Sequence, residues 1–128
     1  MCVKYAYVPL DALRPIQSEV SRDSVRYFED QLERGVDLGP TPVVPLYDSM
    51  LNEQLIVADR HHRTYARCGQ GELLIPVAIH EHDYEIRASQ IGCLSILDTM
   101  DDVRDVYWPW LMRLERHGVT NIADMMAI

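Results

Sequence analysis

Cysteine, lysine and long apolar runs are scarce in this sequence of 128 residues, and each scarcity excludes a class of protein. Its three cysteines, Cys2, Cys68 and Cys93, are an odd number without CxxC spacing, which argues against a disulfide framework or a zinc cluster. No apolar run approaches the roughly 20 residues that span a membrane, and the first residues lack a signal-peptide pattern. We therefore expect reduced thiols and a cytoplasmic protein.

Positive charge is also scarce, because 12 lysines and arginines face 20 aspartates and glutamates and leave a net charge of −8. This balance argues against general binding of DNA or RNA, which needs a basic face to displace counterions. Lys4 is the only lysine, so all other basic residues are arginines. Codon bias explains such an excess, but arginine also suits bidentate contacts with phosphate. The overall negative charge therefore does not exclude a small basic pocket.

The remaining composition is that of one globular domain, and the order of its patterns predicts an α+β fold. Strands are predicted at residues 3–8, 43–47, 54–58 and 73–79. Helices are expected from Asp23 or Ser24 to Gly35, and from about 61 to 68. Pro45 confines its strand to an edge or a bulge. The strand, helix and strand at 54–79 suggest a crossover connection.

The last third of the chain is predicted to be helical. Apolar residues indicate one helix at 86–97, and a second helix should begin with Thr99 as its cap. Pro109 should kink or split that second helix, and a short last helix is expected at 120–126. We therefore expect a compact α+β domain at residues 1–83 and a helical C-terminal extension at residues 84–128 that packs on it.

Three aromatic residues, Tyr107, Trp108 and Trp110, gather in the second of these C-terminal helices. Such a group either stacks on the bases of a nucleic acid or fills a core or dimer contact. The acidic residues nearby favour the core or dimer contact.

The densest charge lies at the junction between the strand at 54–58 and the helix that follows it. Asp59, Arg60, His61, His62 and Arg63 are consecutive there. The first turn of a helix leaves backbone N–H groups unpaired and carries partial positive charge, so it attracts anions. The histidines add donors to these amides, and the arginines add fixed charge. The junction therefore predicts a phosphate site at a helix N-terminus.

Asp59, at the end of the strand, has two candidate roles. It could orient a neighbouring histidine or arginine, or hold a magnesium ion that accompanies the phosphates. His80 and His82 alternate on a strand and could join Asp59 and His61 in a metal site, but their spacing is not diagnostic. A polar turn without any ligand is the alternative for the whole junction.

Five motifs follow one another in order: VPLDALRP at 8–15, a helix with Val25 and Leu32, PVV at 42–44, VADRHHRTYA at 57–66 and IPV at 75–77. This set resembles the ParB/sulfiredoxin-like superfamily over roughly residues 3–82, and its Asp-x-His-His-Arg core is similar to the family's DGHHR-type signature. The resemblance implies a small sheet with helices. It also implies a nucleotide, such as ATP or CTP, whose phosphates sit on the first turn of the motif helix.

By this resemblance, His62 and Arg63 contact phosphate, and Arg60 and His61 complete the nucleotide-binding junction. His61 stands where sulfiredoxin has its catalytic cysteine, so the resemblance does not extend to reduction of a sulfinic acid. Arg60 stands where the family commonly has glycine, which permits a positive φ. Arg60 therefore either alters the turn or donates directly to a phosphate.

Relatives in this superfamily include kinases of free serine, whose base is a glutamate in the loop after the first strand. Glu19 lies in the matching loop, so Glu19 and Asp59 are the candidate catalytic residues. They would serve phosphoryl transfer from a nucleotide, with Mg²⁺, to a small hydroxyl compound. A solvated loop carboxylate is the alternative for Glu19.

The sequence leaves two other functions open. The first is a non-enzymatic, ParB-like nucleotide switch that forms a homodimer through its C-terminal helices. The second is a DNA partition or nuclease protein, which the acidic charge and the missing DNA-binding module disfavour.

Overall fold

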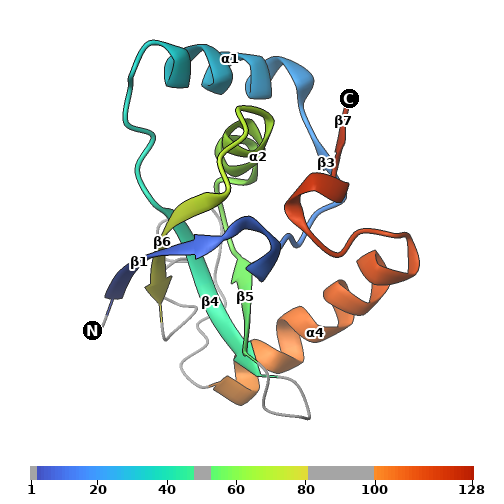
Figure 1. Cartoon of the computed structure of the whole chain (residues 1–128). Helices are drawn as coiled ribbons and strands as arrows, with labels where there is room; N and C mark the ends of the chain where they lie inside the picture. The colour runs from blue at the N-terminus through green and yellow to red at the C-terminus, as the bar shows by residue number, and fades with distance from the viewer. Residues whose placement is uncertain (1–2, 48–52, 81–99) are drawn as a thin grey trace, which may run out of the picture.

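A five-stranded mixed sheet forms the centre of the computed structural model, which describes residues 3–47, 53–80 and 100–128 (Figure 1). The strands lie in the order β1 (Val3–Pro9), β6 (Leu74–His80), β4 (Thr41–Tyr47), β5 (Glu53–Val57) and β2 (Leu13–Arg14). β6 is antiparallel to β1 and parallel to β4, whereas β5 is antiparallel to β4 and parallel to β2.

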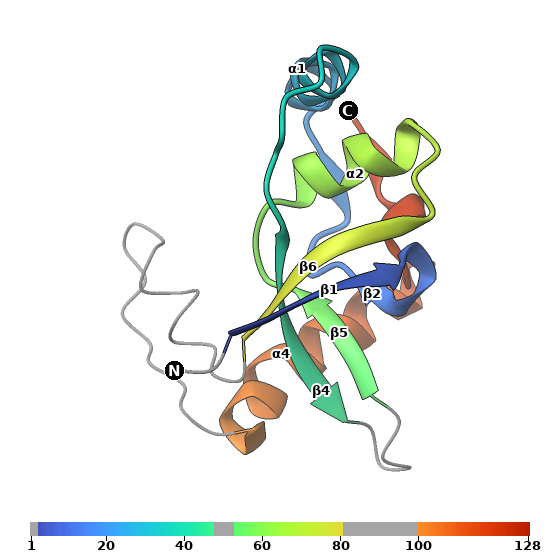
Figure 2. The same cartoon turned by 60° about the vertical axis from the view of Figure 1, so that its left-hand side comes forward.

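Helices cover both faces of this sheet. The longer elements are α1 (Arg22–Glu33), α2 (His61–Gly69) and α4 (Met100–Arg116), and the short ones are the 3-10 turns η1 (Leu10–Ala12) and η2 (Ile122–Asp124). α1 lies over α2 at one end of the molecule, and α4 contacts β4 from the other side (Figures 1 and 2). The predicted α+β fold class is confirmed.

The apolar core lies between the sheet and the α1–α2 layer. Val43, Val57 and Val77 point to this side and are fully buried. Their neighbours Val44 and Ile56 are also fully buried, and because side chains alternate along a strand they face the opposite side. Burial on both faces explains why these strands read as nearly continuous apolar runs rather than as alternating patterns.

The C-terminal segment belongs to the same core. Ile122 and Met125 are buried in the main cluster, and β7 (Met126–Ala127) pairs in parallel with the short strand β3 (Glu19–Val20). The amide of Arg22 donates to the carbonyl of Ile128, 2.7 Å away. The predicted C-terminal extension therefore contacts the predicted N-terminal domain closely, and the boundary we placed between them at 83 falls outside the described residues.

Several predicted boundaries differ from the structure. The predicted crossover between β5 and β6 was wrong, because β4 lies between them and pairs antiparallel with one and parallel with the other. Glu19, expected in a loop, lies in β3. The cap of α1 is Ser21, whose hydroxyl accepts the amide of Ser24, so the helix begins at Arg22. Pro45 pairs with Leu55 of β5, and on its other side the β4–β6 register leads to residue 81, outside the described residues, so the predicted edge stays a prediction.

The C-terminal predictions had mixed outcomes. α4 continues through Pro109 without a break. The predicted last helix is only the turn η2, with Asn121 as its cap, and the chain then forms β7. Residues 86–97, Thr99 and His82 lie outside the described residues. Among the helices that are described, none is both long and apolar enough to cross a membrane.

Ile122→Ala should lower the free energy of unfolding by about 3 kcal/mol, because it leaves a cavity in a fully buried position. Ile128→Ala is the matched control, since that side chain is 63% exposed, and it should cost less than about 0.5 kcal/mol. Urea denaturation measures both values. Equal, small effects would show that the C-terminal segment does not contribute to the core.

Candidate functional site

The turn at Arg60 sets the start of α2. Arg60 has φ 63° and ψ 37°, the left-handed conformation that glycine adopts most easily, and among the described non-glycine residues it alone has a positive φ. The Oδ1 atom of Asp59 accepts the Arg60 amide at 2.8 Å. The Arg60 carbonyl accepts both the amide and the hydroxyl of Thr64, at 3.1 and 2.9 Å. These three hydrogen bonds hold an arginine in a conformation suited to glycine.

The Arg60 side chain contacts the segment before β4. Its Nη1 atom donates to the carbonyl of Pro40 at 3.2 Å. A Cβ atom on Gly39 would lie 3.1 Å from that nitrogen, and Gly39 also has a positive φ of 75°. The glycine therefore allows the guanidinium to approach the backbone closely. Arg60 therefore keeps a turn of the glycine type and does not alter it, whereas donation from Arg60 to a phosphate stays a prediction.

The first turn of α2 presents three backbone N–H groups. These belong to His61, His62 and Arg63, and the first hydrogen bond of the helix is made by the amide of Thr64. No side chain caps this end, and no acceptor for the three amides is found in the described part of the chain. The positive end of the helix dipole adds to their attraction for an anion. This arrangement meets the geometric requirement for a phosphate site.

His61 has a structural role within that turn. Its side chain is only 5% exposed, and its Nε2 atom accepts the backbone amide of Ile16 at 3.1 Å. Burial lowers its pKa from 6.5 to about 4; the nearby Asp59 partly opposes this shift, and His62 adds to it. His61 is therefore neutral near pH 7, with its proton on Nδ1. Its ring links the segment after β2 to α2, so its amide is the group left for a ligand.

The side chain of Arg63, on α2, packs against α1. Its guanidinium carbon lies 5.1 Å from the centre of the Phe28 ring on α1, a cation–π contact. Phe28 in turn meets Tyr27 edge to face, with 5.2 Å between the ring centres. Arg63 and its neighbour His62 are both half-buried. The one arginine in the first turn of α2 is thus fixed by a contact with α1 that the sequence pattern did not reveal.

The two predicted catalytic carboxylates lie on different elements. Asp59 is half-buried at the junction, with one oxygen engaged by Arg60. Glu19 is exposed on β3, a strand that contacts α2. Within residues 3–47, 53–80 and 100–128, no group of three His, Cys, Asp or Glu side chains is placed to hold a metal ion by itself. A magnesium ion bound by Asp59 would therefore take its other ligands from phosphates and water.

Further along α2, two interactions that sequence reasoning missed attach the helix to residues 37–41. The Thr41 and Thr64 hydroxyls lie 2.7 Å apart, and because Thr64 donates to Arg60, Thr41 is the donor between them. The Arg67 guanidinium donates to the Gly39 carbonyl at 3.2 Å and pairs with Glu72 at 3.1 Å. The Thr41–Thr64 and Gly39–Arg67 contacts join residues 23 and 28 positions apart, so no local pattern signals them.

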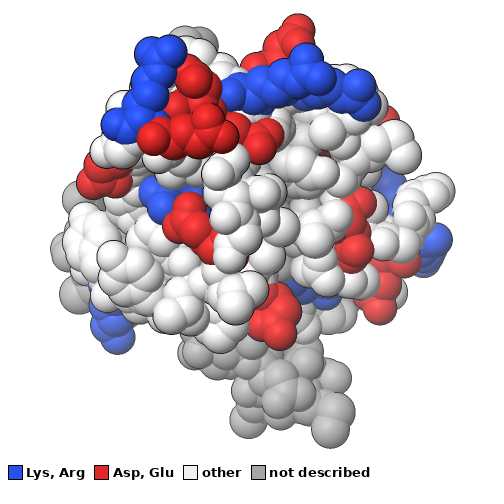
Figure 3. All heavy atoms as spheres, turned by 45° about the horizontal axis from the view of Figure 1, so that its top comes forward, with Lys and Arg blue, Asp and Glu red and all other residues white. Residues whose placement is uncertain are grey.

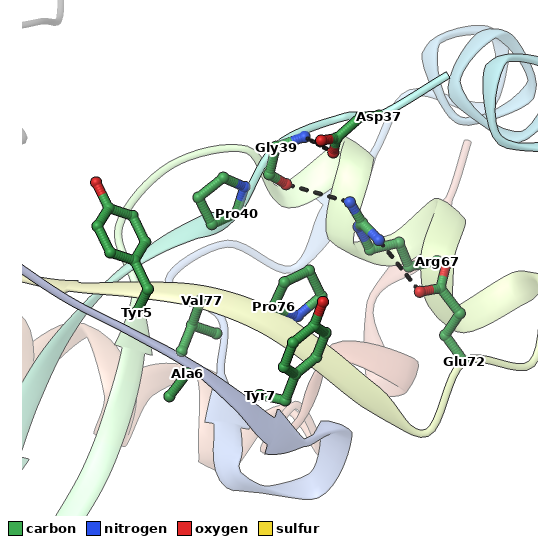
Figure 4. A pocket seen from close by; sticks show the side chains of 10 residues that line it. All are labelled: Tyr5, Ala6, Tyr7, Asp37, Gly39, Pro40, Arg67, Glu72, Pro76 and Val77. Carbon is green, nitrogen blue, oxygen red and sulfur yellow. Dashed lines mark hydrogen bonds and ion pairs between the residues drawn. The ribbon is translucent and has the colours of Figure 1, made fainter. Parts of the chain in front are cut away.

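A cavity of about 550 Å³ lies away from the junction, near Arg67 and Glu72 and beside β1 (Figure 4). The first turn of α2 does not line it. Acidic and basic side chains lie together on the face that carries α1, so that face shows no continuous basic surface (Figure 3). The mixed charge on this face does not suit an extended nucleic-acid surface.

The stability of the protein should depend on pH through His61. In the unfolded chain the pKa of His61 is 6.5, whereas in the folded protein it is about 4, so the imidazole is protonated over a lower pH range after folding. The contribution of neutral His61 to the free energy of unfolding is therefore fully present above pH 6.5. It should fall by about 1.4 kcal/mol per pH unit as the pH drops toward 4. Urea denaturation between pH 7 and pH 4.5 measures this slope.

His61→Gln keeps an acceptor for the Ile16 amide but does not titrate, so it should flatten the slope. His117→Gln replaces an exposed histidine, so it is the control and should retain the slope. An unchanged slope in the His61 variant would contradict the burial of a neutral imidazole.

No model of a known protein family matches this sequence, and no curated protein sequence matches it. A solved structure that is similar is protein Atu1540 from Agrobacterium tumefaciens, with a TM-score of 0.58 and 16% sequence identity. The match covers 97% of this chain but 62% of that one, so the chain spans less than two thirds of the length of Atu1540. At this identity, the likeness shows a similar fold and nothing about activity.

Proposed function

We propose that the start of α2 binds the phosphates of a nucleotide, ATP or another, and that the protein is a cytoplasmic member of the ParB/sulfiredoxin-like superfamily. One observation carries this proposal: three adjacent amides at the N-terminus of α2 lack acceptors among the described residues, next to a fixed arginine. Free donors, the helix dipole and a neighbouring cation together favour a multiply charged anion.

Each residue of the junction has a distinct task in this proposal. The amides of His61, His62 and Arg63 donate to phosphate oxygens, and the Arg63 guanidinium neutralises their charge. The left-handed turn at Arg60 directly precedes these amides, and the Arg60 side chain holds the segment before β4. Asp59 keeps one carboxylate oxygen for a magnesium ion, which when bound would offset the charge of the phosphates.

The reaction that suits this arrangement is transfer of a phosphoryl group from the nucleotide to a small hydroxyl compound. Such a reaction needs mainly positioning, charge neutralisation and a proton acceptor. Glu19 is exposed on a strand that contacts α2, where a carboxylate can take the proton of an acceptor hydroxyl. Burial raises the pKa of the Cys68 thiol on the same helix, which argues against thiolate chemistry there.

Nucleotide with magnesium should raise the melting temperature of the protein, because a ligand that binds only the folded state stabilises it. ATP, ADP, CTP and GTP are compared with adenosine in a thermal-shift assay. Arg63→Ala should weaken nucleotide binding at least about tenfold by removing a charge-assisted contact. Arg113→Ala, at an exposed position on α4, is the control and should bind like the unmodified protein. Absence of a shift with every nucleotide would leave the junction a polar turn without a ligand.

Glu19→Gln should abolish phosphoryl transfer but leave nucleotide affinity unchanged, since it removes the base and not the cradle. Production of ADP from ATP, with serine and other small hydroxyl compounds as acceptors, measures turnover. Glu33→Gln, at an exposed position on α1, is the control. Loss of nucleotide binding in the Glu19 variant would overturn its assignment as a base.

A nucleotide switch is the second candidate, and one observation favours it. η2 packs against α2, and β7 pairs with β3, so the C-terminal segment contacts both elements that carry the site. Occupation of the first turn of α2 could therefore change how the C-terminal segment packs and whether two copies associate. Light scattering with and without nucleotide distinguishes this candidate, because a switch changes its oligomeric state while no product forms.

A further inference from the structure

The 550 Å³ cavity near the C-terminal end of α2 is an open groove along β1. Its walls include Tyr5 and Tyr7 on β1, Pro40 before β4, and Pro76 on β6, with Asp37 and Glu72 toward one end. Figure 4 shows both tyrosine rings projecting from β1 beside the two prolines. We call this feature the β1 groove. It is separate from the start of α2, so nothing proposed above accounts for it.

The two tyrosines make the groove unusual for a surface that only faces water. Each is 73% exposed, and they occupy alternate positions on β1, so they project from the same side about 7 Å apart. Among the described strands, β1 is at the edge of the sheet. Neither ring fills the core. Exposed tyrosines beside prolines form the kind of ridged apolar surface that binds a partner.

Two carboxylates, Asp37 and Glu72, and one guanidinium, Arg67, lie toward one end of the groove, so the lining there carries one excess negative charge. Arg67 is 8% exposed, and its donors are engaged by Glu72 and by the Gly39 carbonyl. Its charge is thus offset by Glu72, which leaves the carboxylate of Asp37 to complement a cation. That carboxylate is held in place, because its Oδ1 atom accepts the amide of Gly39 at 2.8 Å.

We propose that the β1 groove binds a proline-rich segment of another protein that carries an arginine or lysine next to its prolines. Proline-rich segments adopt an extended left-handed helix that is rigid before binding, and grooves lined by aromatic residues recognise them. Prolines three residues apart lie on one face of that helix, about 9 Å from each other. The tyrosine rings receive these prolines, and Asp37 receives the basic side chain.

No segment within the 128 residues supplies this occupant. The seven prolines of the chain are Pro9, Pro15, Pro40, Pro42, Pro45, Pro76 and Pro109, and all lie in the described fold. Residues 81–99 contain no proline. The net charge of −8 further favours a basic partner over a second, equally acidic copy.

Two fluorescent oligoproline peptides test this proposal, one beginning and one ending with arginine, because such helices dock in either direction. Fluorescence anisotropy should show saturable binding of at least one peptide to the full chain. Tyr7→Ala and Tyr5→Ala should each weaken it about tenfold, as expected for truncation of an aromatic anchor. Tyr27→Ala, which removes an exposed tyrosine on α1, is the matched control and should bind normally.

The acidic end is tested separately. Asp37→Asn should weaken the arginine peptides more than an oligoproline without charge, whereas Asp23→Asn, at an exposed position on α1, should not. Arg63→Ala should bind the peptides normally, so failure here is independent of the nucleotide site. Absence of saturable binding, or equal binding by the Tyr5 and Tyr7 variants, would overturn the proposal. So would light scattering in which those variants convert a dimer to a monomer, because a second copy would then occupy the groove.

Discussion

The left-handed turn at Arg60 is the constraint on which the site depends. A residue with a Cβ atom in this conformation costs about 1–2 kcal/mol, and the cost is offset by hydrogen bonds to Asp59 and from Thr64. The turn ends β5 and starts α2 within three residues. The N-cap residue is Arg60, whose side chain has no hydrogen-bond acceptor, so it cannot cap the helix. Three amides therefore remain available at its start, and the proposed phosphate site follows from this geometry.

α2 links two features at its opposite ends. At its start, the buried imidazole of His61 fixes the segment at Ile16, and Arg63 packs on α1. Near its other end, Arg67 fixes the Gly39 carbonyl and so shapes one wall of the β1 groove. The segment at 39–40 is held by both Arg60 and Arg67, so one short loop is tied to both ends of the helix. A single rigid helix thus supports two separate surfaces.

Local patterns in the sequence predicted this central unit well. The apolar run at 54–58, the polar junction and the helix to Gly69 all follow from neighbouring residues, and the structure has β5 and α2 there. The partners of the site were not predictable, because they are distant in the chain. The bond between Ile16 and His61 spans 45 residues, and no periodicity signals it. The pairing of β3 with β7 was hidden for the same reason, since two-residue strands leave no pattern.

Backbone NMR of the start of α2 tests the central claim most directly. The amide resonances of His61, His62 and Arg63 are followed while ATP with magnesium is added, and adenosine with magnesium serves as the control. If phosphates occupy the first turn, these three amides should shift downfield and saturate with ATP, whereas adenosine should leave them unchanged. ATP binding that leaves all three amides unshifted would contradict a phosphate site at this helix.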